Sequence, residues 1–324
     1  MLNSYLMRKK KKRIEVNMDI SIICPIYNGE NYIKKLNESL LMQEGAGDFE
    51  IRYILTRSKD NSEEILKSLN AQYTLIEPKE FSHSLSREQE AFRAEGDIIV
   101  FISQDVIIQD KYWLANLTKD IKSGICDASF SRQLSDNKTI ERYTRMKNYP
   151  EESRIVSKAD IDRLGVMTFF YSDASSAIRK TVYEELKGYD GKRLLTNEDM
   201  YIAYKIINNG YKIKYCADSK VIHSHEYSYK SLLKRYFDQG VFLAQHSYIA
   251  NAGKGSTSSA KALLVFVIKN ALKEKNFRVL FDIIPNFAVR FIGDKLGRRY
   301  KKLSKDRILK YTSNKSYWLK EVYK

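Results

Sequence analysis

The chain has 324 residues, and because 43% of them are hydrophobic it can bury a sizeable core, which excludes wholesale disorder. Its three cysteines are odd in number and lie far apart, which excludes a CxxC zinc site and favours a reducing compartment. The net charge of +16 lies at the two ends, because residues 1–18 and 251–324 carry +5 and +13 and the remainder carries −2.

The first third of the chain alternates strands with helices. The apolar patterns predict strands over 20–24, 49–56, 73–78 and 97–103, with helices over 28–41, 57–69 and 84–96. Four such alternations are typical of a parallel sheet with helices on both faces. Gly96 is predicted to end the third helix as its C′ residue.

The regular alternation of strands and helices ends after residue 110. Helices are predicted over 111–124, 139–149 and 197–210, strands over 125–134, 211–217 and 220–225, and a strand, a turn and a helix over 169–190. Residues 228–324 are predicted to be mostly helical and are strongly basic. This half is therefore α+β in character.

Asp105 follows the buried fourth strand, in the segment "DIIVFISQDVIIQD". One interpretation is a plain turn that ends the strand, since Asp is common in turns. The other is a metal or phosphate site, because open α/β folds bind ligands at the carboxyl ends of their strands.

Two acids begin the predicted helix in "NEDMYIAYKIINNG". Glu198 and Asp199 could simply stabilise the helix start, where the dipole favours negative charge. Alternatively, a carboxylate fixed at a helix start can act as a general base toward a hydroxyl.

Two further segments hold candidate ligands. His223 and His225 are two residues apart, so in an extended chain they share one face and could bind a metal, or they are surface histidines. Arg87 begins a helix, where a cation is disfavoured by the dipole unless a phosphate binds it; a solvated Arg is the alternative.

The end of the first strand, "CPIYNG", is a candidate nucleotide site. Pro25, Tyr27 and Asn28 lie at the carboxyl edge of the sheet, where a base or ribose could pack. The segment is neither a GxGxxG nor a GxxxxGK loop, which disfavours a Rossmann dehydrogenase and a P-loop kinase.

Several segments taken together resemble family 2 glycosyltransferases with a GT-A fold. They are "SIICPIYNGENYIKKLNESLL", "FEIRYILTRSKDNS", "HSLSREQEAFRAEGDIIVFISQD", "SDASSAIRKTVYEELKGYD", "NEDMYIAYKIINNGYKI" and "VIHSH", within about residues 19–225. In that family, "FSHSLSREQ" followed by "SQD" is most similar to bacterial rhamnosyltransferases of cell-surface polysaccharide synthesis. The resemblance implies an α/β fold with a mostly parallel sheet, and inverting transfer of L-rhamnose from dTDP-rhamnose onto a lipid-linked polysaccharide acceptor.

The resemblance also implies roles for individual residues. Asp199 is expected to be the catalytic base, and Asp173 and Glu198 are expected to face the sugar or the acceptor. Asp105 and His223 are expected to hold a divalent cation, Mn²⁺ or Mg²⁺. The residues expected to line the nucleotide-sugar site are Pro25, Tyr27, Asn28, Thr56, Asp60, Arg87, Gln104 and Asp105.

The chain departs from the family pattern at two positions. Thr56 stands where the family usually has an Asp that contacts the base, and Ser103 stands where the usual D-x-D has its first Asp. The resemblance therefore fixes neither the donor nor strict metal dependence. A UDP-hexose donor, a non-catalytic scaffold and a basic nucleic-acid-binding protein are the alternatives.

The distribution of charge bears on partners and location. Basic ends beside apolar stretches favour an anionic membrane surface, whereas a nucleic-acid enzyme is expected to carry its charge around its cleft. No secretory signal is apparent, and no run approaches the roughly 20 apolar residues of a spanning helix. We expect a cytoplasmic protein, peripheral on the inner face of a bacterial cell membrane.

The expected organisation has three parts. Residues 1–18 form a basic flexible arm, and residues 19–227 form the catalytic domain, with a nucleotide-binding half over 19–109 and an acceptor half over 110–227. Residues 228–324 form a helical, basic region that contacts a membrane or a second copy in a homo-oligomer.

Overall fold

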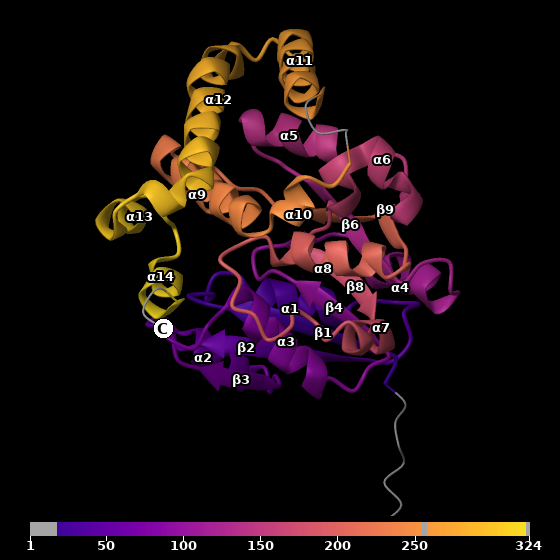
Figure 1. Cartoon of the computed structure of the whole chain (residues 1–324). Helices are drawn as coiled ribbons and strands as arrows, with labels where there is room; N and C mark the ends of the chain where they lie inside the picture. Colours follow the sequence, from indigo (N-terminus) through magenta and orange to yellow (C-terminus); the bar gives the residue numbers. More distant parts are fainter. Residues whose placement is uncertain (1–17, 254–257, 322–324) are drawn as a thin grey trace, which may run out of the picture.

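Figure 1 shows a computed structural model of the chain, which describes residues 18–253 and 258–321. Apart from Met18, the predicted basic arm lies outside the described residues. One mixed sheet forms the centre of the molecule. Its strands are β1 (Ile20–Ile26), β2 (Phe49–Thr56), β3 (Tyr73–Ile76), β4 (Ile98–Ile102), β5 (Ile107–Ile108), β6 (Ala128–Leu134), β7 (Arg154–Val156), β8 (Ser175–Arg179) and β9 (Ile213–Ile222).

The order of the strands divides the sheet into two halves. The order is β3-β2-β1-β4-β8-β6-β9-β5, with β7 also paired to β9. Strands β1 to β4 all run parallel, and β6 and β9 run in the same direction, whereas β8, β5 and β7 run against them. The predicted mostly parallel sheet is therefore confirmed, with the antiparallel strands in the second half.

Helices cover both faces of the sheet. The helices before residue 210 are α1 (Ile33–Leu41), α2 (Ser62–Ser68), α3 (His83–Arg93), α4 (Trp113–Lys122), α5 (Ile140–Asn148), α6 (Ile161–Leu164), α7 (Lys180–Glu185) and α8 (Glu198–Asn208). Strand β4 is apolar throughout because it is covered on both sides. Its Ile98, Val100 and Ile102 pack with α1 and α4, and Ile99 and Phe101 pack with α3, α7 and α8.

The described residues after 228 form six α-helices. They are α9 (Tyr229–Gln245), α10 (Ser247–Ala250), α11 (Ser258–Lys273), α12 (Phe277–Arg298), α13 (Lys305–Tyr311) and α14 (Lys315–Glu321). Helices α9 and α12 approach so closely that a Cβ at Gly297 would lie 2.1 Å from the carbonyl oxygen of Phe237. Within the described residues, no helix is long and apolar enough to cross a membrane.

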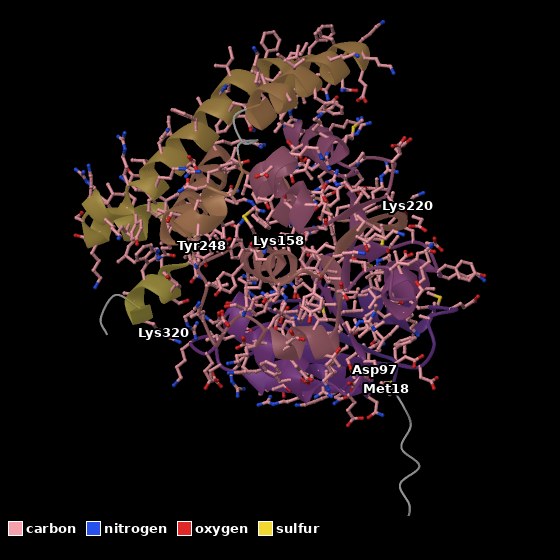
Figure 2. The ribbon with its side chains drawn as sticks, turned by 45° about the vertical axis from the view of Figure 1, so that its right-hand side comes forward. Met18, Asp97, Lys158, Lys220, Tyr248 and Lys320 are labelled. Atoms are coloured by element: carbon pink, nitrogen blue, oxygen red, sulfur yellow. The ribbon has the colours of Figure 1, made fainter. Side chains whose placement is uncertain are left out.

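The long helix α12 packs along α9, and α11 and α12 both pack against α5. Ile140 and Tyr143 of α5 share an apolar cluster with residues of α11 and α12, and Arg142 forms an ion pair with Glu274 at 2.7 Å. In Figure 2, these gold-coloured helices form the outermost band of the molecule, and side chains project from them away from the sheet. Met18, where the described chain begins, lies at the opposite end beside Asp97.

Besides the short strands β5 and β7, which were not predicted, two details differ from the sequence-based predictions. The strands predicted over 211–217 and 220–225 are one strand, β9, in which a bulge shifts the pairing with β6 after Ser131. Gly96 does not act as a helix C′ residue, since α3 ends at Arg93 with Ala94 as its cap. Instead, a Cβ at Gly96 would lie 2.5 Å from the backbone of Ile20, so close packing against β1 requires the glycine.

Candidate active site

The loop after β1 is held by the loop after β4. The backbone N–H of Tyr27 donates to Oε1 of Gln104 (2.8 Å), and Nε2 of Gln104 donates to the carbonyl of Tyr27 (3.0 Å). Asn28 adopts a positive φ of 47°, and its N–H donates to Oγ of Ser58 (2.9 Å). Gln104 therefore joins the carboxyl ends of two adjacent strands, while the ring of Tyr27 stays exposed.

Asp60 organises the same edge from the loop after β2. Its carboxylate accepts from the N–H of Glu30 (3.0 Å) and from the hydroxyl of Ser62 (2.6 Å). Burial acts to raise the pKa of Asp60, but these hydrogen bonds outweigh burial and lower the pKa. An ionised Asp60 thus orients the backbone of two loops at the predicted nucleotide site.

Pro25 and Thr56 lie near the ends of the first two strands. Pro25 is within β1, and Thr56 is the last residue of β2. Thr56 is buried, and Oγ1 of Thr56 has no hydrogen-bond partner within the described part of the chain. A buried hydroxyl of this kind usually has a partner, so a ligand is one explanation for its state.

Arg87 connects the two halves of the domain. This buried residue of α3 donates from Nη1 to Oε1 of Glu198 (3.2 Å), at the start of α8, and to the carbonyl of His83 (3.1 Å). The pKa of Arg87 is raised, because the charges of Glu198 and Asp173 outweigh the effect of burial. Among the described residues, nothing accepts a hydrogen bond from its buried Nε.

Asp173 lies beside this ion pair, just before β8. Its carboxylate accepts from the hydroxyls of Tyr189 (2.7 Å) and Ser176 (2.9 Å). Burial raises the pKa of Asp173, and the charge of Glu198 adds to the effect while Arg87 opposes it. Arg87, Asp173 and Glu198, which are far apart in sequence, therefore form one electrostatic cluster.

Asp199 follows Glu198 in the first turn of α8. Asn197 precedes the helix rather than forming its first residue, and it adopts a left-handed φ of 57° while its side chain makes no capping hydrogen bond. Burial raises the pKa of Asp199 well above its usual value, and the negative charges of Glu198 and Asp173 add to it. A carboxyl group in these surroundings holds a proton more tightly than an exposed one does.

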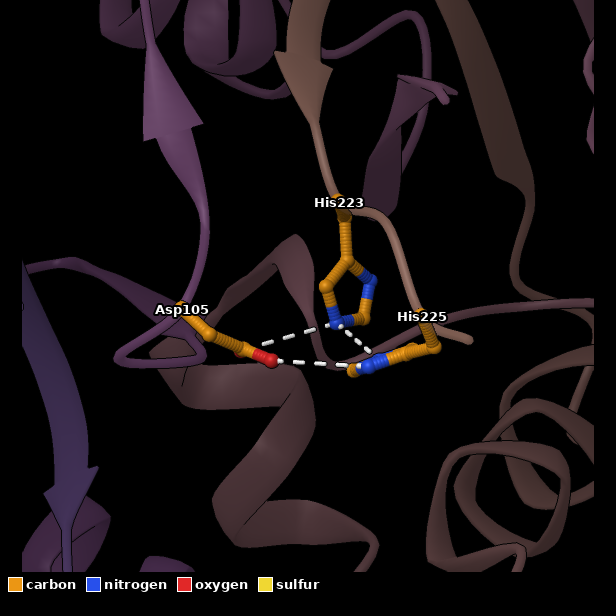
Figure 3. Close-up of side chains that lie close together, drawn as sticks. All are labelled: Asp105, His223 and His225. Carbon is orange, nitrogen blue, oxygen red and sulfur yellow. Dashed lines mark hydrogen bonds and ion pairs between the residues drawn. The ribbon is translucent and has the colours of Figure 1, made fainter. Parts of the chain in front are cut away.

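Three side chains converge beyond the carboxyl ends of β4 and β9. Figure 3 shows Asp105, from the turn after β4, facing His223 and His225, which follow β9. Nε2 of His223 lies 3.5 Å from Oδ1 of Asp105, and Nδ1 of His225 lies 3.8 Å from Oδ2. One ligand atom from each residue lies within 4.8 Å of the others, a spacing that one metal ion can bridge.

The protonation of this cluster suits a metal site. Burial acts to raise the pKa of Asp105, but the hydrogen bond to His223 and the two imidazoles outweigh burial and lower the pKa. Burial, and then the charge of His223, lowers the pKa of His225 to about 4. An ionised carboxylate and a neutral imidazole are the forms that bind metals.

Gln133 orients His223 through Nδ1, the ring nitrogen that does not face Asp105. The amide oxygen of Gln133 accepts from Arg145, and it lies 3.0 Å from Nδ1 of His223. Because an amide oxygen only accepts, Nδ1 carries a proton, so Nε2, which lies toward Asp105 and 2.8 Å from Nε2 of His225, is the nitrogen that can bind a metal. This is the arrangement that fixes the tautomer of metal-binding histidines.

Tyr227 and Arg235 link the two clusters. The ring of Tyr227 lies 5.4 Å from that of His225, and its hydroxyl accepts from Nη1 of Arg235 (3.2 Å). The charge of Arg235 in turn lowers the pKa of Asp199. The metal-binding cluster and the carboxylate cluster are therefore adjoining parts of one region.

Sequence reasoning predicted most, but not all, of these neighbours. The spacing of the two histidines indicated that His225 could join His223, yet only His223 was assigned as a ligand. Gln133 and Arg145 carry no signal in the sequence, because their part depends on the pairing of β6 with β9 and on the position of α5. Arg235 was missed for the same reason.

Comparison with known proteins assigns the chain to a family. Residues 21–187 match the sequence profile of Glycosyl transferase family 2. The chain belongs to this family. It is therefore a glycosyltransferase, and the membership and the α/β GT-A fold predicted from the sequence are both confirmed.

Two curated members of the family match nearly the whole chain. The O-antigen chain rhamnosyltransferase RfbN of Salmonella typhimurium strain LT2 is 33% identical over 309 residues, which cover 93% of this chain and 96% of RfbN. The O-antigen chain rhamnosyltransferase WbaN of Salmonella anatum is 34% identical over 268 residues, which cover 81% of this chain and 83% of WbaN.

Solved structures share the fold of this family 2 enzyme at low sequence identity. The mannosyltransferase PcManGT from Pyrobaculum calidifontis, in complex with GDP-Man and Mn²⁺, has a TM-score of 0.55 at 15% identity, covering 96% of this chain and 92% of its own. S. aureus TarS 1–349 has a TM-score of 0.52 at 16% identity, covering 87% and 92%. These likenesses concern the fold alone.

Proposed function

We propose that this enzyme transfers L-rhamnose from dTDP-rhamnose onto a lipid-linked saccharide of a bacterial cell-surface polysaccharide, with inversion of the anomeric centre. The observation that carries the proposal is the similarity of 93% of the chain to an O-antigen chain rhamnosyltransferase. The position of the site residues at the carboxyl edge of the sheet also supports the proposal.

The donor nucleotide binds at the carboxyl ends of β1, β2 and β4. Two buried polar atoms without partners among the described residues support this assignment, namely Oγ1 of Thr56 and Nε of Arg87. The hydroxyl of Thr56 is suited to the edge of a base, and the guanidinium of Arg87 is suited to a phosphate oxygen. Pro25, Tyr27 and Asn28 then line the base and the ribose.

Asp105, His223 and His225 fit a divalent cation. Mg²⁺ is usually bound through oxygen atoms, so two imidazoles beside one carboxylate favour a first-row transition ion. Mn²⁺ is the candidate, because the mannosyltransferase PcManGT is in complex with Mn²⁺. Gln133 supports the fit, because its contact with Nδ1 of His223 leaves Nε2 as the nitrogen that can bind a metal. When bound, such an ion neutralises the charge of the donor diphosphate.

The reaction is a single displacement. Asp199 takes the proton of the acceptor hydroxyl, whose oxygen forms a bond to the anomeric carbon. The bond from that carbon to the β-phosphate oxygen breaks on the opposite face, and dTDP leaves with the electron pair. Arg87 stabilises the charge that develops on the leaving group, and Asp173 and Glu198 hold the sugar or the acceptor.

The donor can be identified by thermal unfolding in the presence of nucleotide-sugars. We expect dTDP-rhamnose with Mn²⁺ to raise the apparent unfolding temperature most, because a ligand that binds only the folded state stabilises it. The panel includes UDP-glucose, UDP-galactose and GDP-mannose, each with and without Mn²⁺. A larger shift with a UDP-hexose would contradict the rhamnosyl donor and leave the glycosyltransferase assignment in place.

The outer face of α11 and α12 is proposed to contact an anionic membrane surface on the cytoplasmic side. It exposes large apolar side chains, and Phe281, Ile284 and Phe291 of α12 are 84%, 79% and 63% exposed. Residues 251–324 carry eighteen Lys or Arg and five acids. Apolar side chains flanked by basic residues are typical of helices that lie in a bilayer interface.

Exposed residues of α12 provide the test of membrane contact. We expect the variant Ile284→Ser/Phe291→Ser to bind phosphatidylglycerol vesicles at least about a hundredfold more weakly in a pelleting assay, since each buried apolar side chain contributes about 1.5–3 kcal/mol. The matched control is Leu41→Ser/Met42→Ser, which removes similarly exposed apolar residues at the C-terminal end of α1. Equal binding by both variants would argue against contact through α12.

A further inference from the structure

A cavity lies beside the proposed metal site. Its volume is about 550 Å³, which is within the range of ligand-binding pockets. Three segments form its walls: the start of α5, residues 226–229 at the start of α9, and the first four turns of α12. The donor-site residues discussed above are not among those that line it.

The charges of the cavity favour an uncharged ligand. Three cations and three carboxylates line it, so the formal charges cancel. These residues are Lys138, Arg278, Arg290, Glu141, Glu226 and Asp282. A nucleoside diphosphate carries several negative charges and would be expected to select a cationic pocket, so the balance argues for a neutral, polar molecule.

A fixed network of polar groups forms part of the wall. The hydroxyl of Tyr229 donates to Oδ1 of Asp282, and Nδ2 of Asn286 donates to Oδ2 of Asp282 (3.2 Å). Arg290, which is only 8% exposed, donates from Nε to Oδ1 of Asn286 (2.7 Å) and from Nη1 to the hydroxyl of Tyr236 (2.9 Å). Guanidinium and carboxylate groups held in this way can bind the hydroxyls of a ligand without a further loss of side-chain conformational entropy.

Aromatic rings lie among the polar groups. Tyr227, Tyr229 and Phe281 line the cavity, and Phe281 is 84% exposed. An exposed aromatic ring beside fixed polar groups matches a pyranose, which presents C–H groups on its faces and hydroxyls around its edge. This combination favours a saccharide over an acyl chain, which could make no hydrogen bond to the charged groups of Asp282 and Arg290.

The cavity opens next to the metal-binding cluster. Glu226 and Tyr227 follow His225 directly in the chain, and Nδ2 of Asn137 donates to the carbonyl of His225 (2.9 Å). Lys138, the next residue, lines the cavity. The lining of the cavity is therefore contiguous with the segments that carry and contact the metal-binding cluster.

We infer that this cavity binds the saccharide portion of the acceptor, and that the acceptor lies between the proposed metal site and the membrane-facing side of α12. The inference rests on the proposed glycosyltransfer and deepens it, because it assigns the acceptor a neutral saccharide site separate from the donor nucleotide. The inference is tested at Phe281, because this residue lines the cavity and is exposed on α12.

Saturation-transfer NMR on the 37.8 kDa chain tests the inference without a lipid. The probes are the methyl glycosides of L-rhamnose, D-galactose, D-mannose and N-acetyl-D-glucosamine. We expect at least one to bind in the presence of saturating dTDP and Mn²⁺. Phe281→Ala should weaken that binding about three- to tenfold, the usual size of one aromatic contact. Phe277→Ala removes another exposed Phe of α12 that does not line the cavity, so glycoside binding should be unchanged in this variant.

The outcomes separate this inference from the proposed function. Loss of binding in Phe281→Ala alone supports the saccharide site. No binding of any glycoside, competition by dTDP, or equal binding by both variants overturns it. Stabilisation of the wild-type chain by dTDP-rhamnose is measured on the same samples, and its absence counts against the proposed donor whatever the glycosides do.

Discussion

Replacing Asp199 by Asn is expected to reduce the rate of glycosyl transfer at least about a hundredfold while donor binding is kept. A positioned general base contributes a factor of about 10²–10⁴ to a rate, and Asn keeps the shape of the side chain without its basicity. Transfer is measured with saturating donor and acceptor, and donor binding by the thermal shift with dTDP-rhamnose.

The surroundings of Asp199 also predict how the rate of transfer depends on pH. Burial raises its pKa, the charges of Glu198 and Asp173 raise it further, and Arg235 opposes them. The base works only when deprotonated, so transfer is expected to fall as the pH drops through this raised pKa, above the ordinary Asp value of about 3.9. The wild-type chain should show this acid limb, and Asp199→Asn should lack it.

A surface carboxylate supplies the matched control. Asp162→Asn, on the exposed face of the short helix α6, makes the same chemical change away from the site, and its rate should equal that of the wild type. Undiminished transfer by Asp199→Asn would remove Asp199 from the role of base.

Loss of Asp105 is expected to have the second large effect, on metal binding. Asp105→Ala should weaken Mn²⁺ binding at least about a hundredfold, and His225→Ala at least about tenfold, because groups that merely support metal ligands already change affinity 10–100-fold. Free Mn²⁺ is measured by its electron paramagnetic resonance signal during titration with dTDP present. Chelation of the metal should also remove the donor-dependent thermal shift.

His246→Gln is the control for the loss of an imidazole. His246 stacks on Phe242 at the end of α9, and it is not part of the cluster of Asp105, His223 and His225. Its replacement should leave Mn²⁺ binding unchanged. If Asp105→Ala bound Mn²⁺ as tightly as this control, the cluster would not be the metal site.

Local patterns in the sequence were sufficient for most of the sheet. Strand β4 is uniformly apolar because both of its faces are buried, and α1 buries Ile33, Leu36 and Leu40 on one side, so each pattern is visible in a short window. The short strands β5 and β7 were not predicted, because two or three residues carry no period that a window can detect.

The candidate site was predictable only where its residues belong to recognisable motifs. Asp105, Asp199 and His223 follow or begin strongly patterned elements, so their likeness to a family could be seen. The tautomer of His223 depends on Gln133, whose position comes from β6. The placement of Phe281 depends on how α12 packs against α9, which no local pattern encodes.

The amino-acid sequence by itself determined the order of strands and helices, the family, and the residue types available for chemistry, because these follow from short-range periodicity and from motifs. Tertiary structure alone decided which of these residues meet. It placed Arg87 against Glu198, 111 residues later in the chain, and it formed a cavity from α5, the start of α9 and α12. Such contacts follow from the packing of whole elements against one another, which depends on all the buried surfaces at once.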